Sequence, residues 1–483
     1  MKKATLFVVF LLLVTGAWCE ETGRKSPGSK TIARLSEGKL DLTIPEVGVD
    51  VKRVTLDNGI IVYLYEDHRL PMVNVSSIIR CGSIYDDDVK DGLSGLVGTV
   101  MRTGGTKNIS GDSLNMLMEY MGGSLETSIG TESGSASLSV LSKDLDRGLG
   151  LYADLLRNPA FPQDKLDLAK TEIKNRIKRR NDDPATITNR YVYHTLYGEH
   201  PYGRVLEWAT IKGITPVDLV TYHQRFFVPN NLLIGVSGDF SSDELVAKLK
   251  QYLGDWPRSS EPLPAIQEVA AAPHPGVFLI KKDINQTNLG IAHLGIKRDN
   301  PDRFAINIMN YILGGGSFTS RLTSRVRSDE GLAYHVSSSF DIGSRDYGMF
   351  RASCQTKAAS TYKATRIIVD EIERIAREGV NEQELTEARE SLMNRLVFNF
   401  DNAGKIVRNL MALEFDGYPL DYYKTYFDNY RKVTRADVQM VAGKYLKPGE
   451  LSFIVVGNPA TFDKSLDEFG PVTTIELAPP SID

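Results

Sequence analysis

The chain has 483 residues, of which 42% are hydrophobic and 24% are charged, and its formal net charge is −4. This is the composition of a globular protein large enough for two or more domains, and it offers no basic footprint for nucleic acid. The three cysteines, Cys19, Cys81 and Cys354, are too few for a disulfide framework and lack the paired spacing of a zinc ribbon.

The first 19 residues have the layout of a secretory signal peptide. Two lysines precede the apolar run Leu6 to Val14, and small residues from Thr15 to Ala17 follow it. The sequence therefore predicts an exported protein, either periplasmic or secreted. An alternative is a lipoprotein attached through Cys19, because Gly16-Ala17-Trp18-Cys19 resembles a bacterial lipoprotein box, although Trp18 next to the cysteine fits that box poorly.

Residues 20–45 are polar and show no apolar periodicity, which predicts a flexible lead-in. The apolar run in the signal peptide is short for a membrane span, and no later stretch is long and apolar enough for one. No transmembrane segment is therefore expected in the mature chain.

The first domain is expected to span residues 46–257. Val51 to Leu56 and Ile60 to Tyr65 are β-rich and flank Asp57-Asn58-Gly59, which is a strong hairpin signal. Further strands are expected at 72–79, 124–129, 135–141 and 231–236, and helices at 92–104, 143–157 and 164–180.

The helix that starts at Gly92 has a continuous apolar face. The residues at helical spacing on that face are Leu93, Leu96, Val97, Val100 and Met101. Gly92, Gly95 and Gly98 interrupt the helix, at a cost of about 1 kcal/mol each relative to alanine, and Gly104-Gly105 ends it. Taken alone, these glycines indicate close packing against a neighbouring backbone.

The pattern restarts after a proline-rich stretch. Residues 258–276 predict an extended, semi-stiff linker, and residues 277–483 are expected to form a second domain. An offset of 219 residues carries Leu166, Ala169, Asn175, Arg176, Asp182, Thr215, Asp218, Pro229, Leu232, Val236 and Gly238 onto Leu385, Ala388, Asn394, Arg395, Asp401, Thr434, Asp437, Pro448, Leu451, Val455 and Gly457. The sequence therefore predicts two homologous α+β domains, each a mixed sheet with helices over one face.

The segment 92–106 begins Gly-Leu-Ser-Gly-Leu-Val-Gly-Thr and ends Gly-Gly-Thr. It resembles the first catalytic helix of the pitrilysin (insulinase-like) zinc metallopeptidases, a family that includes the mitochondrial processing peptidase. The resemblance extends from about Pro45 to the C-terminus, and it implies two halves that face each other like a clamshell.

The catalytic helix of this family carries the inverted zinc motif His-x-x-Glu-His. Aligned without gaps, the two histidines fall on Gly95 and Thr99, and the catalytic glutamate falls on Gly98. Glycine offers neither a metal ligand nor a proton acceptor, and a threonine hydroxyl is a poor zinc ligand. The chain thus keeps the helix and lacks its chemistry, so we expect no metal or other cofactor in this chain.

The resemblance places the family's third zinc ligand on Glu172 and a second acidic position on Lys165. One carboxylate without its histidines does not hold zinc usefully, so a surface or inter-helix salt bridge is the expected role of Glu172. The seven histidines form no helical pair and no cluster with cysteines along the sequence, which gives no support to a replacement metal site.

A second motif lies in the second domain. Ser320-Arg321-Leu322 and the segment 326–334 resemble a family signature in which an arginine and a tyrosine stand seven residues apart around Gly-Leu. The resemblance implies that Arg327 and Tyr334 reach the scissile peptide, where a guanidinium and a phenol can stabilise an oxyanion. The alternative is a structural role, with Arg327 bridging and Tyr334 packing between helix and strand. The glycine run 314–316 matches a turn of the family and is interpreted as structural.

These features together suggest the non-zinc subunit of a heterodimeric peptidase. A homologous partner subunit would hold the zinc, and the substrate would be a peptide or an unfolded protein. Glu126-Thr127 replaces the Asn-Ala that active relatives often carry, so peptide docking in the first domain is not expected. The competing hypotheses are a catalytically dead scaffold or peptide-binding protein of the same fold, and an autonomous hydrolase with an unrecognised site.

Overall fold

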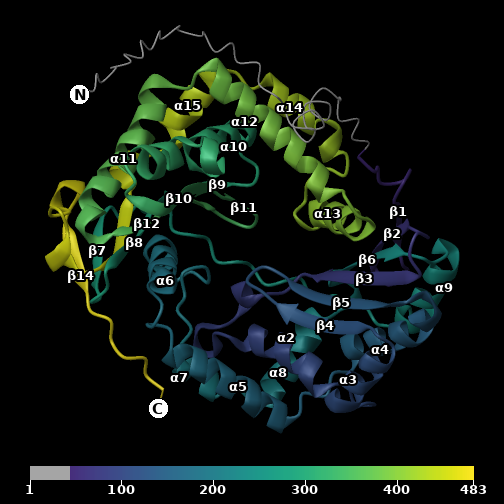
Figure 1. Cartoon of the computed structure of the whole chain (residues 1–483). Coiled ribbons are helices and arrows are strands. Elements are labelled where there is room, and N and C mark those ends of the chain that lie inside the picture. Colours follow the sequence, from purple (N-terminus) through teal and green to yellow (C-terminus); the bar gives the residue numbers. More distant parts are fainter. Residues whose placement is uncertain (1–43, 483) are drawn as a thin grey trace, which may run out of the picture. The chain divides into compact units, whose positions relative to one another are not determined.

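The computed structural model describes residues 44–482, and these contain two six-stranded sheets (Figure 1). The strands of the first sheet are β1 (Lys52–Thr55), β2 (Ile61–Glu66), β3 (Met72–Ile79), β4 (Ser124–Ile129), β5 (Gly134–Leu141) and β6 (Leu232–Gly238). The strands of the second sheet are β7 (Gly276–Lys281), β8 (Gln286–Leu294), β10 (Ala333–Phe340), β12 (Met349–Lys357), β13 (Ser452–Gly457) and β14 (Val472–Ile475). Two short strands, β9 (Ile296–Lys297) and β11 (Ile342–Gly343), pair separately. The predicted signal peptide and nearly all of the predicted lead-in lie outside the described residues.

Both sheets are mixed, as predicted. The strand order is β1-β2-β6-β3-β5-β4 in the first sheet and β10-β12-β8-β13-β7-β14 in the second. β2 is parallel to β6, and β7 is parallel to both β13 and β14, whereas the other neighbours are antiparallel. The predicted strands at 72–79 and 124–129 have the bounds of β3 and β4.

The helices of residues 44–257, here called the first half, are α2 (Leu93–Gly104), α3 (Gly111–Tyr120), α4 (Leu145–Arg157), α5 (Gln163–Lys178), α6 (Pro184–Tyr197), α7 (Trp208–Lys212), α8 (Pro216–Phe226) and α9 (Ser242–Leu253). The helices of residues 276–482, the second half, are α10 (Arg303–Asn310), α11 (Thr361–Glu378), α12 (Glu382–Arg395), α13 (Ala403–Phe415), α14 (Tyr426–Lys432) and α15 (Arg435–Tyr445). Two π-helical segments, Tyr311–Gly315 and Thr323–Asp329, lie between α10 and β10. None of the helices among the described residues is long and apolar enough to cross a membrane.

The predicted internal repeat is present in the structure. The 219-residue offset carries the first residues of α5, α6 and α8 onto the first residues of α12, α13 and α15. The sheets also correspond strand by strand, except at one edge. There β1 joins the first sheet through the predicted hairpin, whereas β14 reaches the second sheet from the C-terminal end of the chain.

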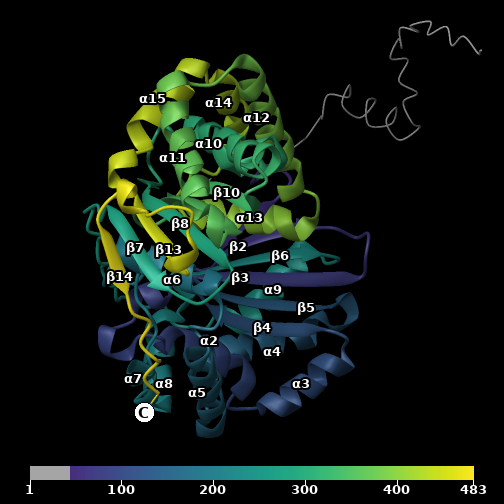
Figure 2. The same ribbon diagram turned by 60° about the vertical axis from the view of Figure 1, so that its left-hand side comes forward.

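The two halves exchange one helix each. α6, from the first half, packs on β8 and β13 of the second sheet, and α13, from the second half, packs on β2, β3 and β6 of the first sheet (Figure 1 and Figure 2). Helices therefore contact both faces of each sheet, and the prediction of helices over one face only was wrong. The reason is that each sheet has a second apolar face, which a helix from the other half covers.

Two glycines permit this exchange. An added Cβ at Gly290 of β8 would lie 2.6 Å from Val192 Cγ2 of α6, and one at Gly235 of β6 would lie 2.3 Å from Val407 Cγ1 of α13. Each strand lacks a side chain where the exchanged helix crosses it, because only glycine leaves room for so close an approach.

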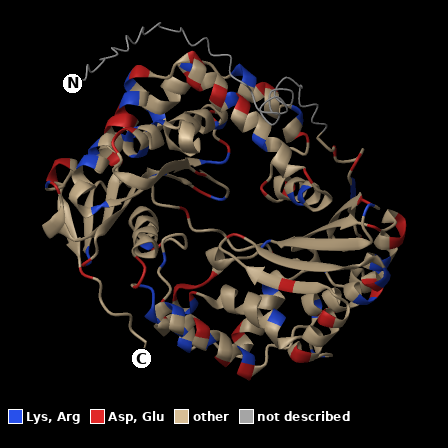
Figure 3. Ribbon diagram, viewed as in Figure 1, with Lys and Arg blue, Asp and Glu red and all other residues tan. Residues whose placement is uncertain are grey.

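The central strands show why both faces need cover. All six residues of β13 are buried. Phe453 and Val455 belong to the core beneath the second half's own helices, while Ile454 and Val456 pack with α6. Successive side chains of a strand point to opposite faces, so a strand with apolar side chains on both faces requires packing on both sides. Figure 3 accordingly shows the charged residues mostly on helices and loops, with few on the strands.

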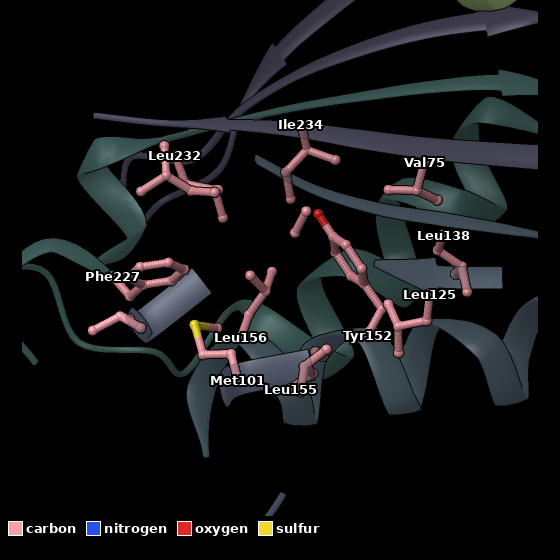
Figure 4. Packing of buried hydrophobic residues seen from close by; sticks show 14 of the residues in the cluster. Val75, Met101, Leu125, Leu138, Tyr152, Leu155, Leu156, Phe227, Leu232 and Ile234 are labelled. Atoms are coloured by element: carbon pink, nitrogen blue, oxygen red, sulfur yellow. The ribbon is translucent and has the colours of Figure 1, made fainter. Parts of the chain in front are cut away.

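The core of the first half lies between its sheet and the helices α2, α4 and α8. Figure 4 shows Met101 of α2 and Tyr152 of α4 among side chains of the sheet such as Ile234. The Tyr152 hydroxyl is buried and hydrogen-bonds to the Ser77 hydroxyl of β3. Burial raises the pKa of Tyr152, so this phenol stays neutral and satisfies its polar atom inside the core.

The proline-rich stretch 258–275 has no regular secondary structure but is anchored at several points. The backbone N–H of Val269 donates to Asp346 Oδ2 at 2.7 Å, and the Ser452 hydroxyl donates to the His274 carbonyl at 2.6 Å. Arg225 of α8 donates to the Pro262 carbonyl. Polar side chains of both halves therefore hold this predicted linker in place.

Candidate functional site

The glycine-bearing helix α2 is positioned by a buried carboxylate. Asp86 accepts hydrogen bonds from the backbone N–H of Gly92 at 3.1 Å and of Ser94 at 3.2 Å, and from the Ser94 hydroxyl at 2.8 Å. Burial raises the pKa of Asp86 to about 7, and these hydrogen bonds act in the opposite direction. The first backbone N–H groups of a helix lack partners within it, so Asp86 supplies the missing acceptor.

The predicted apolar face of α2 lies in the core. Leu96, Val97, Val100 and Met101 are fully buried, and Leu93 packs at the edge of the same cluster. Gly92, at the start of the helix, has φ +96°, a left-handed conformation that favours glycine. This glycine is therefore explained by the chain's entry into the helix.

Gly98, at the position of the family's catalytic glutamate, lies against strand β4. An added Cβ would lie 2.6 Å from the Ile129 amide nitrogen, and the Thr127 hydroxyl donates to the Gly98 carbonyl at 2.7 Å. The backbone of a paired strand thus occupies the space that a side chain at position 98 would need.

The two histidine positions differ from Gly98. No atom lies within 4 Å of a Cβ built on Gly95. Thr99 is exposed, and its hydroxyl donates to the Gly95 carbonyl at 3.0 Å, one turn back along the helix. The hydroxyl is therefore engaged with the backbone of its own helix.

Gly95, Thr99 and Glu172 line one pocket of about 250 Å³ between α2, α5 and β4. The resemblance therefore identified residues that the fold brings together, 73 positions apart between Thr99 and Glu172. Among residues 44–482 no group of three His, Cys, Asp or Glu side chains is arranged to hold a metal ion. The pocket offers one carboxylate and one hydroxyl, which do not fit the tetrahedral nitrogen and sulfur ligand sets typical of zinc.

Glu172 does not form the expected salt bridge. Within the described part of the chain it makes no hydrogen bond or ion pair, and its exposed side chain borders the pocket instead. Lys165, at the second acidic position of the family, pairs with Asp112 of α3 at 3.1 Å. Lys165 lies about two turns before Glu172 on α5, so its pair with Asp112 leaves the Glu172 carboxylate free toward the pocket.

Arg327 and Tyr334 lie side by side in the second half. Arg327 is in the π-helical segment Thr323–Asp329, and its guanidinium carbon is 5.0 Å from the centre of the Tyr334 ring. The register of β10 with β12 shifts between Ala333 and His335, so Tyr334 stands at a bulge. A bulge re-aims a side chain away from the regular ladder, and Tyr334 is 83% exposed.

Phe318 completes this arrangement, and sequence reasoning missed it. Its ring lies 4.8 Å from the Arg327 guanidinium on a side chain that is 68% exposed. The signal that could have found it is its position next to Gly314-Gly315-Gly316-Ser317. Gly314, Gly315 and Ser317 of this turn line a second pocket of about 250 Å³, together with Arg327 and Tyr334. Ser317 has φ +55°, an uncommon conformation for a residue with a side chain.

Neither structural role considered for the pair is observed. Among the described residues, the Arg327 guanidinium has no hydrogen-bond or ion-pair partner, and its contacts are the two aromatic faces. The Tyr334 hydroxyl likewise has no partner in the described chain, and the ring is not packed in the core. The donors of both side chains are therefore available to a bound molecule. This pocket and the pocket at Glu172 share no lining residue.

Comparison with known proteins accounts for these features. Residues 61–209 match the sequence model described as Insulinase (Peptidase family M16), and residues 213–392 match the Peptidase M16 inactive domain. The chain belongs to peptidase family M16. The predicted family is thereby confirmed, and with the zinc positions replaced the chain is an inactive M16 family member.

Its similarity to other M16 proteins extends over most of the chain. A Helicobacter pylori protein named non-peptidase homolog YmxG is 24% identical over 81% of this chain and 90% of its own length. An uncharacterized zinc protease of Mycobacterium tuberculosis is 26% identical over 62% of this chain and 69% of its own length. The crystal structure of a peptidase M16 inactive domain from Pseudomonas fluorescens superposes with a TM-score of 0.77 at 26% identity, covering 85% of this chain and 98% of that one.

Proposed function

We propose that this chain is the non-zinc subunit of a two-chain M16 peptidase. In this proposal a homologous partner subunit holds the zinc ion, and Arg327 and Tyr334 complete the proteolytic site. The observation that carries the proposal is the free Arg327 guanidinium beside an exposed, bulged tyrosine, in a chain whose own zinc helix lacks every catalytic side chain.

The chemistry of the two residues suits a peptide bond under attack. The guanidinium carries its charge at all physiological pH values and offers five N–H donors, while the phenol offers one O–H donor. Both would bind the carbonyl oxygen more strongly as it gains negative charge, which is how a donor stabilises a transition state. Phe318 and Tyr334 flank the guanidinium and hold it over their faces.

Export of the mature chain is part of the same proposal. The predicted signal peptide would direct it to the periplasm or outside the cell, with lipidation at Cys19 as the alternative. Mass spectrometry of the mature N-terminus distinguishes cleavage without lipid from a diacylated cysteine.

The decisive experiment is steady-state cleavage of a fluorogenic peptide by this chain, assembled with a homologous M16 subunit that has an intact His-x-x-Glu-His motif. We expect neither subunit alone to cleave efficiently. Tyr334→Phe should lower kcat of the pair by about 10²–10³, the usual effect of losing one oxyanion donor. Arg327→Ala should have a similar effect.

Two exposed residues of the first half serve as matched controls. Tyr120→Phe removes a hydroxyl that is as exposed as that of Tyr334, and Arg147→Ala removes an exposed arginine. Both should leave kcat unchanged. If the Arg327→Ala, Tyr334→Phe double variant assembles and retains full activity, the catalytic role is wrong and the scaffold hypothesis is favoured. Separate elution of the two subunits at micromolar concentration would contradict the proposal as a whole.

A further inference from the structure

A cavity in the described part of the first half has no role in the proposed site. It has a volume of about 660 Å³ and lies between the C-terminal part of α5, the start of α6 and residues 204–206. It adjoins the degenerate zinc pocket, with which it shares Glu172, Ile173, Arg176 and Leu206.

The cavity is lined by five arginines and a single carboxylate. The arginines are Arg176, Arg179, Arg180, Arg190 and Arg204, and the carboxylate is Glu172. Residues 163–180 contain seven basic and three acidic side chains, in a chain whose net charge is −4. Positive charge is therefore concentrated around this cavity, although the chain as a whole has a net negative charge.

Only two of these arginines are neutralised. Arg180 pairs with Glu207 at 2.8 Å and Arg204 pairs with Asp88. Arg190 donates to neutral oxygens only, the Arg180 carbonyl at 2.9 Å and Asn181 Oδ1 at 2.7 Å, and burial lowers its pKa. Three of the five arginines therefore have no carboxylate paired with them among the described residues, and the cavity keeps a net positive charge beside Glu172.

Arg176 and Arg179 are the two arginines free to bind a ligand. Both are exposed, and neither guanidinium makes a hydrogen bond or an ion pair within residues 44–482. Arg176 lies in the last turn of α5, and Arg179 is the residue that follows this helix. A guanidinium without a partner is well suited to bind a carboxylate through two parallel hydrogen bonds.

The remaining lining is mainly apolar, with Asn175 and Thr186 as its polar members. The apolar part of the lining, here called the floor, consists of Ile173, Ile177, Val205 and Leu206. An inorganic anion has no favourable contact with such a floor, whereas an apolar side chain between acidic residues has one. The combination of this floor and the two free arginines therefore selects a ligand with both an apolar and a carboxylate part.

The chain itself places extended backbone beside this cavity. Asn181, whose Oδ1 is held by Arg190, donates from Nδ2 to the Ala478 carbonyl at 3.1 Å. From β14 the C-terminal segment continues toward α7 (Figure 1 and Figure 2), and Ile482 packs against the core of the first half. Side chains around the cavity thus already bind a peptide segment through its backbone.

We propose that the cavity is a binding site for an acidic peptide segment, with an apolar side chain on the isoleucine floor and flanking carboxylates on Arg176 and Arg179. No peptide docking in the first half is expected from the sequence, because of Glu126 and Thr127 on β4, but no residue of β4 lines this cavity. The inference does not rest on the proposed function, since the binding concerns this chain alone.

Fluorescence anisotropy with the purified chain tests the site. The probe is a labelled peptide, Glu-Glu-Leu-Glu-Glu with both ends blocked, and the comparison peptides replace glutamate by lysine or leucine by glycine. We expect the acidic leucine peptide to bind, the lysine peptide not to bind, and the glycine peptide to bind several times more weakly. Binding should weaken as the salt concentration rises.

The double variant Arg176→Gln, Arg179→Gln should weaken binding about tenfold or more, since hydrogen bonds between charged groups are the strong ones. Arg147→Gln, which changes an exposed arginine on α4, is the matched control and should bind as the unmodified chain does. All three positions are exposed, so circular dichroism should show intact folding. Equal binding by the double variant and the control would overturn the proposal. Displacement of the peptide by an equal concentration of tripolyphosphate would also overturn it, because the site would then recognise charge alone.

Discussion

Replacing Gly98 with alanine should destabilise the fold, while the same change at Gly95, on the same helix, should stabilise it. At position 98 the added Cβ would lie 2.6 Å from the Ile129 amide nitrogen and 3.0 Å from the Ser128 carbonyl carbon. These are backbone atoms of β4, which is paired with β5 at Ile129 and Gly134. The strand therefore cannot move aside as a flexible side chain could.

The two variants isolate the steric cost. Alanine gains about 1 kcal/mol over glycine inside a helix, and overpacking against a rigid neighbour costs about 1–3 kcal/mol. Gly95→Ala meets no atom within 4 Å, so it should raise the free energy of unfolding by up to about 1 kcal/mol. The free energy of unfolding of Gly98→Ala should be about 1–3 kcal/mol lower than that of Gly95→Ala.

Urea denaturation followed by circular dichroism gives both free energies of unfolding, provided that the m-values agree. Equal stability of the two variants would refute the argument that β4 closes position 98. The same geometry bears on restoring the zinc motif. Positions 95 and 99 have room for the larger side chains of Gly95→His and Thr99→His, but Gly98→Glu requires α2 and β4 to separate. The triple variant should therefore be less stable than the double histidine variant.

The remaining predictions concern metal, pH and the exchanged helix. The purified chain should contain no stoichiometric zinc by elemental analysis after mild dialysis, and about one zinc per chain would contradict the assignment of Gly95 and Thr99. Burial lowers the pKa of His223 and of His293 to about 4. Histidine in the unfolded chain has a pKa near 6.5, so the unfolded state binds protons first as the pH drops. The free energy of unfolding should therefore fall between about pH 6.5 and pH 4, by up to about 3 kcal/mol for each histidine. Urea denaturation at several pH values checks this, with a shallower pH dependence in His223→Gln. Glu414 of α13 accepts two hydrogen bonds from Arg53 of β1, at 2.6 and 2.8 Å. Glu414→Ala should therefore lower the free energy of unfolding by about 2 kcal/mol in thermal or urea denaturation. A decrease below about 0.5 kcal/mol would show that this pair does not fix the helix.

Local periodicity and internal repetition determined much of this protein from the sequence. The strand at 72–79 and the helix that starts after Gly92 were predictable because alternation and helical spacing reflect which side chains face the core. The two-domain repeat followed from one offset that matched in two separate stretches. The pair Arg327 and Tyr334 and the loss of the zinc ligands were found by resemblance to a family motif, and in the fold Arg327 and Tyr334 lie side by side.

Contacts between distant segments decided the rest. The exchange of α6 and α13 depends on Gly290 and Gly235, which in sequence are only glycines inside strands. Three further features bring together residues that no local sequence pattern relates. They are the packing of β4 against position 98, the contact of Phe318 with Arg327, and the arginine cavity on α5. Periodicity shows that a side chain is buried or exposed, but the identity of its neighbour depends on how the whole chain packs, and that packing exists only in the tertiary structure.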